Sequence, residues 1–227
     1  MAIKFVDEAD LTAVGNAIRA KTGGTGLLTF PTGMAEAIAG IQAGGDDGSF
    51  KSVLERTAVN PTLPDDLTII GNYAFNACSN LALTSLPSNI TSIGNYAFYN
   101  CKKLALTSLP SPLTLIGDYA FQNCVKLALT SLPSGITRIG MYAFYGCTGL
   151  TEISIPSAVT TVDVGAFYNC TGLTTVTFMG TPNLLNSSTF SKCTNLTTIN
   201  VPWAPGVKTN APWGATNATI NYNYTGG

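Results

Sequence analysis

Six cysteines recur at one fixed interval, and this repetition restricts the fold more than any other feature of the chain. Each cysteine stands 23 residues after the previous one, with a phenylalanine three residues before it and a leucine three residues after it. Repetition with a period of about 20 to 29 residues is typical of a solenoid in which each period forms one coil. The repeated residues are Phe75, Phe98, Phe121, Phe144, Phe167 and Phe190, then Cys78, Cys101, Cys124, Cys147, Cys170 and Cys193, then Leu81, Leu104, Leu127, Leu150, Leu173 and Leu196.

One complete period runs from Cys147 to residue 169. Leu150, Ile153 and Ile155 indicate a strand of about six residues, which Pro156 ends because proline has no N–H to donate. The return half reads Ile-Gly-x-Tyr-Ala-Phe in four coils, and we expect a turn followed by a short helical or irregular stretch there. This sequence occupies residues 70–75, 93–98, 116–121 and 139–144, and the last two coils depart from it at 162–165 and 185–188.

The full repeat resembles the BspA-like type of bacterial leucine-rich repeat, whose units read approximately L-x-x-I-x-I-P-x-x-V-x-x-I-G-x-x-A-F-x-x-C. The resemblance implies a right-handed α/β solenoid with a short parallel sheet, found on bacterial surface proteins and adhesins and used for attachment without catalysis. The chain departs from the pattern where threonine replaces the middle apolar residue. This departure is Leu-Ala-Leu-Thr-Ser-Leu-Pro at residues 81–87, 104–110 and 127–133.

The chain divides into four parts. Residues 1–43 are predicted to form a helical segment, with apolar residues at helical spacing in 11–21 and again after Pro31. The Gly- and Asp-rich residues within 44–55 indicate a linker and N-terminal cap. The solenoid is expected over 56–205 because a single coil buries too little apolar surface to fold alone, and 206–227 are expected to form a closing strand.

The first segment resembles a second family. Residues Asp10 to Ile38, with Leu-Thr-Phe-Pro at 28–31, are similar to a short module at the start of tail-associated structural proteins of phages and prophages of Gram-positive gut bacteria. The resemblance implies attachment to a phage tail assembly. Met1 to Asp10 contains no apolar run of the kind found in a secretory signal peptide, so we expect a virion component rather than an exported adhesin.

Composition argues against several classes of function. The chain has no histidine, which removes the commonest general base and metal ligand. Charged residues make up 10% of the chain and the net charge is -1, so a nucleic-acid surface is not expected. Without a long apolar segment, membrane insertion is not expected either. We therefore predict a protein that is not an enzyme and binds no cofactor or metal.

The repeated cysteines are interpreted as buried thiols. Stacked cysteines could approach closely enough for disulfides, but their register with phenylalanine favours a small apolar side chain at a coil corner. A straight row of thiols cannot surround zinc tetrahedrally.

The aromatic residues are also interpreted as structural. Tyr73, Tyr96, Tyr119 and Tyr142 form a row that we expect to pack between coils. Trp203 and Trp213 are expected to cover the end of the core, with the alternating residues 218–224 as a closing strand over the last coil.

The predicted binding surface is the outward face of the sheet. One outward row joins Ser85, Ser108, Ser131, Ser154, Thr177 and Asn200, and the row beside it joins Leu83, Leu106, Leu129, Glu152, Thr175 and Thr198. The three leucines either form an exposed apolar patch, which would suit a partner, or turn inward at a bulge that exposes Thr84, Thr107 and Thr130. On the first alternative, a ligand binds at the N-terminal half of the sheet.

Two functions remain open. The chain is either a binding or adhesion protein that recognises a bacterial surface glycan or protein, on a phage tail or on a cell surface, or a rigid structural spacer of a phage tail that binds no ligand.

Overall fold

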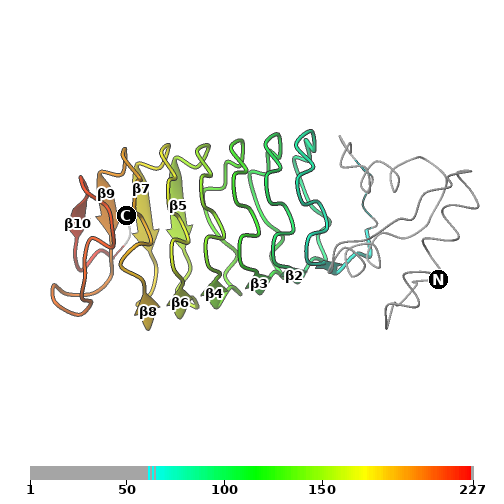
Figure 1. Ribbon diagram of the computed structural model, residues 1–227. Coiled ribbons are helices and arrows are strands. Elements are labelled where there is room, and N and C mark those ends of the chain that lie inside the picture. The colour runs from blue at the N-terminus through cyan, green and yellow to red at the C-terminus, as the bar shows by residue number, and fades with distance from the viewer. Residues whose placement is uncertain (1–60, 62, 64, 226–227) are drawn as a thin grey trace, which may run out of the picture.

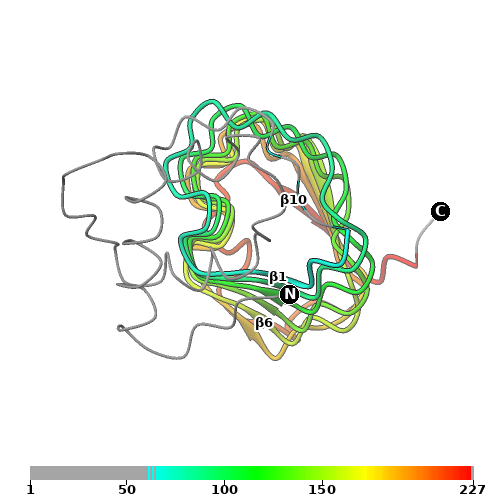
Figure 2. The ribbon, with the colours of Figure 1, turned by 90° about the vertical axis from the view of Figure 1, so that its right-hand side faces the viewer.

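The chain folds into a solenoid of stacked coils. The computed structural model describes residues 61, 63 and 65–225, in which the coils lie side by side along one axis (Figure 1). Viewed along this axis, the coils superpose into one closed outline (Figure 2). Ile70 pairs with Ile93 and Ile93 with Ile116, so the coils repeat every 23 residues, as the sequence predicts. The predicted helical segment 1–43 and linker 44–55 lie outside the described residues.

A six-stranded parallel sheet runs along one side of the coils, in the order β1-β2-β3-β4-β6-β8. Each strand has two residues, and all but the last end at the buried isoleucine or valine that begins the return half of the coil. These strands were not predicted, because the glycine after the isoleucine indicates a turn at this point of the coil. The strands are β1 Ile69–Ile70, β2 Ser92–Ile93, β3 Leu115–Ile116, β4 Arg138–Ile139, β6 Thr161–Val162 and β8 Leu184–Leu185.

A four-stranded parallel sheet lies on another side, in the order β10-β9-β7-β5 (Figures 1 and 2). Its strands are β5 Glu152–Ile155, β7 Thr175–Phe178, β9 Thr198–Asn200 and β10 Thr219–Asn221. β5 and β7 have four residues each, shorter than expected. β10 pairs with β9 and closes the sheet, which confirms the predicted closing strand.

Tight turns replace the helical stretch that the sequence suggested. Tyr73, Tyr96, Tyr119 and Tyr142 have φ between 50° and 60°, a left-handed conformation that interrupts a helix. Alternate N–H groups of this stretch donate to the next coil, as Phe75 does to the carbonyl oxygen of Ala97 at 2.7 Å, and those between them donate three residues back, as Asn76 does to Tyr73 at 3.0 Å. No helix occurs in the part of the chain that the structure describes. The α/β class is therefore corrected to a solenoid of short parallel strands and turns.

The core is a set of stacked identical side chains. Phe121 is fully buried, with its ring centroid 5.4 Å from those of Phe98 and Phe144. All six cysteines are buried thiols that form no disulfide, as predicted. Since each side chain fills the same place in every coil, the core continues without a gap between the two sheets.

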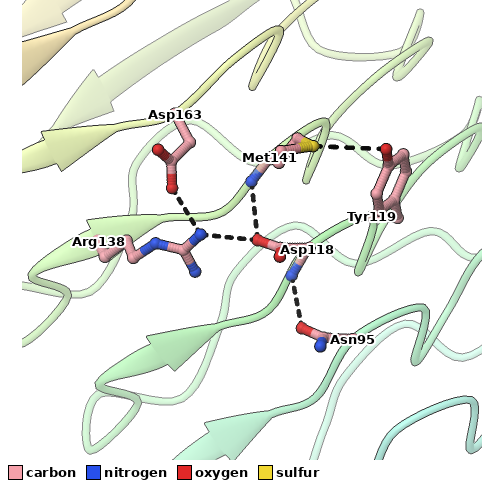
Figure 3. Close-up of polar contacts among 6 residues, drawn as sticks. All are labelled: Asn95, Asp118, Tyr119, Arg138, Met141 and Asp163. Carbon is pink, nitrogen blue, oxygen red and sulfur yellow. Dashed lines mark hydrogen bonds and ion pairs between the residues drawn. The ribbon is translucent and has the colours of Figure 1, made fainter.

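Side-chain oxygens join the coils beside the six-stranded sheet (Figure 3). The Oδ1 atom of Asn95 accepts a hydrogen bond from the N–H of Asp118 at 2.8 Å, and the Oδ1 atom of Asp118 accepts one from the N–H of Met141 at 2.9 Å. A Cβ atom at Gly140 would lie 2.7 Å from the Asp118 Oδ1 atom. The glycine of the Ile-Gly motif is therefore needed because the carboxylate of the preceding coil approaches its Cα.

Two tryptophans close the C-terminal end of the core, as predicted. Trp213 is fully buried and Trp203 is 5% exposed. Their ring centroids lie 6.1 Å apart, and both pack edge-on against Phe178. Because neither ring presents a face to solvent, the tryptophans cover the last coil and offer no stacking platform for a sugar.

Candidate functional site

The outward side chains of β5, β7, β9 and β10 form two parallel rows, which we call the sheet face. The strand register aligns Ser154 with Thr177, Thr177 with Asn200 and Asn200 with Asn221. This places Ser154, Thr177 and Asn200 in one row, as predicted. The second row contains Glu152, Thr175, Thr198 and Thr219.

Asn221 and Thr219 extend the two predicted rows by one strand, and the 23-residue interval did not place them there because the last coil is shorter than the others. Thr219 pairs with Thr198, a step of 219 − 198 = 21 residues rather than 23. The tripeptide Thr-Ile-Asn at 198–200 recurs at 219–221, and this recurrence is the signal that could have predicted the register of the last strand.

Amide side chains join neighbouring strands of the sheet face. Asn200 Nδ2 donates to Thr177 Oγ1 at 3.1 Å, and Asn221 Nδ2 donates to Asn200 Oδ1 at 2.8 Å. Asn200 is only 8% exposed. These bonds fix the orientation of the side chains before any ligand arrives, which lowers the entropy cost of binding.

The N-terminal half of the predicted surface is different. Leu106 and Leu129 are 0% and 1% exposed, and Leu83 is half-buried and packed against the core. The backbone bends at Thr84, Thr107 and Thr130, and these threonines are exposed together with Ser85, Ser108 and Ser131.

The second alternative for the leucines is therefore confirmed, and the exposed apolar patch is corrected to a row of hydroxyl pairs. The structure places leucine in the core and threonine in water because burying an apolar side chain is favourable, whereas burying an unpaired hydroxyl is costly. The bend also interrupts the sheet, since only an isolated bridge between Ser131 and Ser154 joins these coils to β5.

The sheet face is polar and nearly uncharged. Glu152 is the one ionisable residue in its two rows, and the other positions carry hydroxyl or amide groups. Hydroxyl and amide groups both donate and accept hydrogen bonds. This set of groups suits a neutral hydrogen-bonding partner and lacks a nucleophile activated by a neighbouring base.

A cluster of three charged side chains lies beside the six-stranded sheet. One guanidinium nitrogen of Arg138 lies 2.8 Å from the Asp118 carboxylate and 2.6 Å from that of Asp163 (Figure 3). The arginine pairs with both carboxylates, offsets one of their two negative charges and links three coils. Among the described residues, no group of three or more His, Cys, Asp or Glu side chains could hold a metal ion.

No helix in the part of the chain that the structure describes is long and apolar enough to cross a membrane.

The repeat identifies the class of protein. The family model for the BspA type leucine rich repeat region matches residues 47–134 and 114–209. These matches cover more than half of the chain, which therefore belongs to the BspA-type leucine-rich repeat family. Comparison with curated protein sequences gave no match.

Several solved structures are similar to this chain. A T. pallidum leucine rich repeat protein is 32% identical with a TM-score of 0.55, over 62% of this chain and 68% of that protein. The pneumococcal vaccine antigen PcpA shares the fold at 18% identity and a TM-score of 0.55, over 72% of this chain and 42% of PcpA. A leucine rich cell surface protein from Faecalibacterium prausnitzii is 23% identical with a TM-score of 0.42, over 74% of this chain and 52% of that protein.

Proposed function

We propose that the chain is a non-catalytic binding module whose sheet face attaches to a bacterial surface glycan or protein. The observation that carries the proposal is the aligned row of Ser154, Thr177, Asn200 and Asn221, held in register by the strands beneath it, in which the buried Asn200 orients its neighbours. Leucine-rich repeat solenoids are typically non-catalytic scaffolds with an extended binding surface. Display outside the bacterial cell, on a cell surface or on a virion, is part of the proposal.

The mode of attachment to a larger assembly is a second part of the proposal. The resemblance of residues Asp10 to Ile38 to phage tail proteins supports a phage tail assembly as the partner of the N-terminal segment. The segment would hold the chain at its N-terminal end and leave the sheet face accessible.

The binding experiment compares two charged double variants of the full chain. Thr175→Lys with Thr198→Lys places bulky cations on the sheet face, whereas Ser92→Lys with Leu184→Lys places them at outward positions of the six-stranded sheet. Each fluorescently labelled protein is applied to a glycan array and to whole Gram-positive gut bacteria. We expect the first variant to lose binding and the second to bind as the unmodified chain does.

A rigid spacer is the alternative function, favoured by the amides that bond to each other across β7, β9 and β10. A spacer would bind neither cells nor glycans in any form. Equal binding by both double variants would exclude the sheet face as the site while keeping a binding function.

A further inference from the structure

A hollow of about 360 Å³ lies among the turn segments of the middle coils, outside the strands of the sheet face. Its lining is Tyr119, Gln122, Tyr142, Tyr145 and Tyr168. All five residues belong to the stretch between the six-stranded sheet and the cysteine of their coil. The hollow is therefore separate from the binding surface proposed above.

The hollow forms where the regular row of tyrosines ends. The rings of Tyr73, Tyr96 and Tyr119 stack nearly parallel, with centroids 4.9 Å and 4.6 Å apart, so packing between coils is confirmed for this row. Tyr142 is tilted by 31° relative to Tyr119. The next position in the row is Gly165, and a Cβ atom there would overlap the Tyr142 ring.

At position 165, glycine replaces the tyrosine of the earlier coils, and the backbone keeps the same conformation. Its φ is 60°, within the range of 50° to 60° that the four tyrosines of the row adopt. The missing side chain leaves space into which the Tyr142 ring leans, and the ring leaves the stack. The aromatic row therefore ends at Tyr142, since the following positions of the row are Gly165 and Ser188.

A second row of residues forms the facing wall. Gln122, Tyr145 and Tyr168 stand one period apart, and the two tyrosine rings stack at 5.3 Å with an angle of 6°. Tyr142 stands across this pair, at 72° to Tyr145 and 71° to Tyr168. The hollow therefore offers aromatic surfaces in two perpendicular orientations.

Gln122 adds a hydrogen-bond acceptor without a partner. Its Oε1 atom is buried and accepts no hydrogen bond within the described part of the chain. A buried acceptor without a donor is destabilising, so a ligand hydroxyl toward which the Gln122 side chain turns would supply the bond that this oxygen lacks. This acceptor is an observation independent of the aromatic rings.

We infer that the hollow binds a neutral pyranose ring. The negative faces of tyrosine rings attract the C–H groups on the apolar face of a sugar, and the sugar hydroxyls supply the donor for Gln122. All five lining residues are uncharged, and Lys192 is held over the Tyr168 ring with its Nζ atom 5.5 Å from the ring centroid. An anionic ligand would lack a cation to pair with in this lining.

Saturation-transfer NMR tests the inference on the full chain. The probes are the methyl glycosides of glucose, galactose, mannose and N-acetylglucosamine, each added alone. We expect saturation transfer to at least one of them, strongest at the C–H protons of one face of the ring. An absence of transfer to all four overturns the inference.

Two variants locate the site. Gly165→Tyr continues the tyrosine row in a backbone conformation that tyrosine already adopts in four coils, fills the hollow and is expected to abolish saturation transfer. Gln122→Leu removes only the acceptor and is expected to weaken binding about tenfold. Undiminished binding by Gln122→Leu overturns the assignment even if Gly165→Tyr fails to fold.

A matched control separates the hollow from its neighbours. Tyr99→Ala removes a tyrosine from the same row as Gln122, one coil earlier and outside the lining, and should bind as the unmodified chain does. The sheet-face variant Thr175→Lys with Thr198→Lys should also keep pyranoside binding. Loss of binding in either control overturns the placement of the site, whereas failure of the sheet-face proposal leaves it unaffected.

Discussion

The Sγ atom of Cys124 donates a hydrogen bond of 3.0 Å to the carbonyl oxygen of Phe98, which stands 26 residues earlier in the preceding coil. The same bond recurs at four further cysteines and gives each of these five thiols both a buried apolar place and a polar partner. The other pairs, all at 3.0 Å, are Cys101 with Phe75, Cys147 with Phe121, Cys170 with Phe144 and Cys193 with Phe167.

Because all six thiols are buried, we expect them to resist modification in the folded protein. Mass spectrometry after iodoacetamide treatment without reductant should show six modified cysteines in denaturant and none under native conditions. Pairs of cysteines that stay unmodified in denaturant until reductant is added would indicate disulfides and contradict the structure.

Because the thiols are buried, we also expect the free energy of unfolding to decrease at alkaline pH. Burial raises the pKa of Cys124, Cys147 and Cys170 above the ordinary value of 9.0. Between pH 9 and the raised pKa, the unfolded chain loses thiol protons that the folded chain keeps, so the free energy of unfolding decreases as pH rises. The slope is at most about 1.4 kcal/mol per pH unit for each thiol.

Urea unfolding at several pH values above and below 9 measures this dependence. Tyrosines and lysines titrate in the same range, so the control is the triple variant Cys124→Ala, Cys147→Ala, Cys170→Ala. A slope in the triple variant as steep as in the unmodified chain would exclude the thiols as its cause.

Phe121→Ala should lower the free energy of unfolding by about 3 to 5 kcal/mol through lost burial and the cavity left behind. Phe121 is fully buried between Phe98 and Phe144. Leu115→Ala in the same coil is the control, since Leu115 is 42% exposed, and it should change the stability far less. Equal effects in urea unfolding would mean that the phenylalanine row is not the core.

The sequence predicts the stacking well because Phe, Cys and Leu hold one interval without exception. It predicts the turns poorly, since Tyr142 and its equivalents adopt a positive φ that tyrosine seldom adopts, and the glycine at the equivalent position 165 is a weak signal for it. Along Leu127 to Leu132, alternation permits two assignments of inward and outward residues. The cost of burying Thr130 decides between them, and only the three-dimensional contacts reveal that decision.

The outward residues of β5, β7 and β9 could be predicted from the sequence because their alternation of apolar and polar residues is regular. Ile153, Val176 and Ile199 alternate with polar residues in an unbroken pattern, so their strands permit only one assignment. The pyranose hollow was not predictable, because it depends on the tilt of Tyr142 over a glycine that the sequence presents only as a departure from the repeat.

The buried leucines give a prediction opposite to the one that the exposed patch would give. Leu106→Ser with Leu129→Ser should destabilise the protein by several kcal/mol, about 2 to 5 for each site, because serine leaves a cavity and an unpaired hydroxyl in the core. Thermal unfolding measures the effect. Thr107→Ala with Thr130→Ala, in the same two coils but exposed, should leave the melting temperature nearly unchanged. The reverse outcome would show that the leucines face solvent.

Asp118 allows its two interactions to be separated, because Asn72 and Asn95 occupy the same position in earlier coils. Asp118→Asn keeps an oxygen for the Met141 N–H but loses the ion pair with Arg138, which is partly exposed, so we expect a loss below about 1 kcal/mol that vanishes at high salt. Asp118→Ala also leaves the Met141 N–H without its acceptor and should cost about 1 to 2 kcal/mol more, at low and high salt alike. Urea unfolding of both variants at two salt concentrations measures these differences. If Asp118→Asn and Asp118→Ala were equally destabilised, the ion pair rather than the bond between coils would be the stabilising contact, and the row of side-chain oxygens would not hold neighbouring coils together.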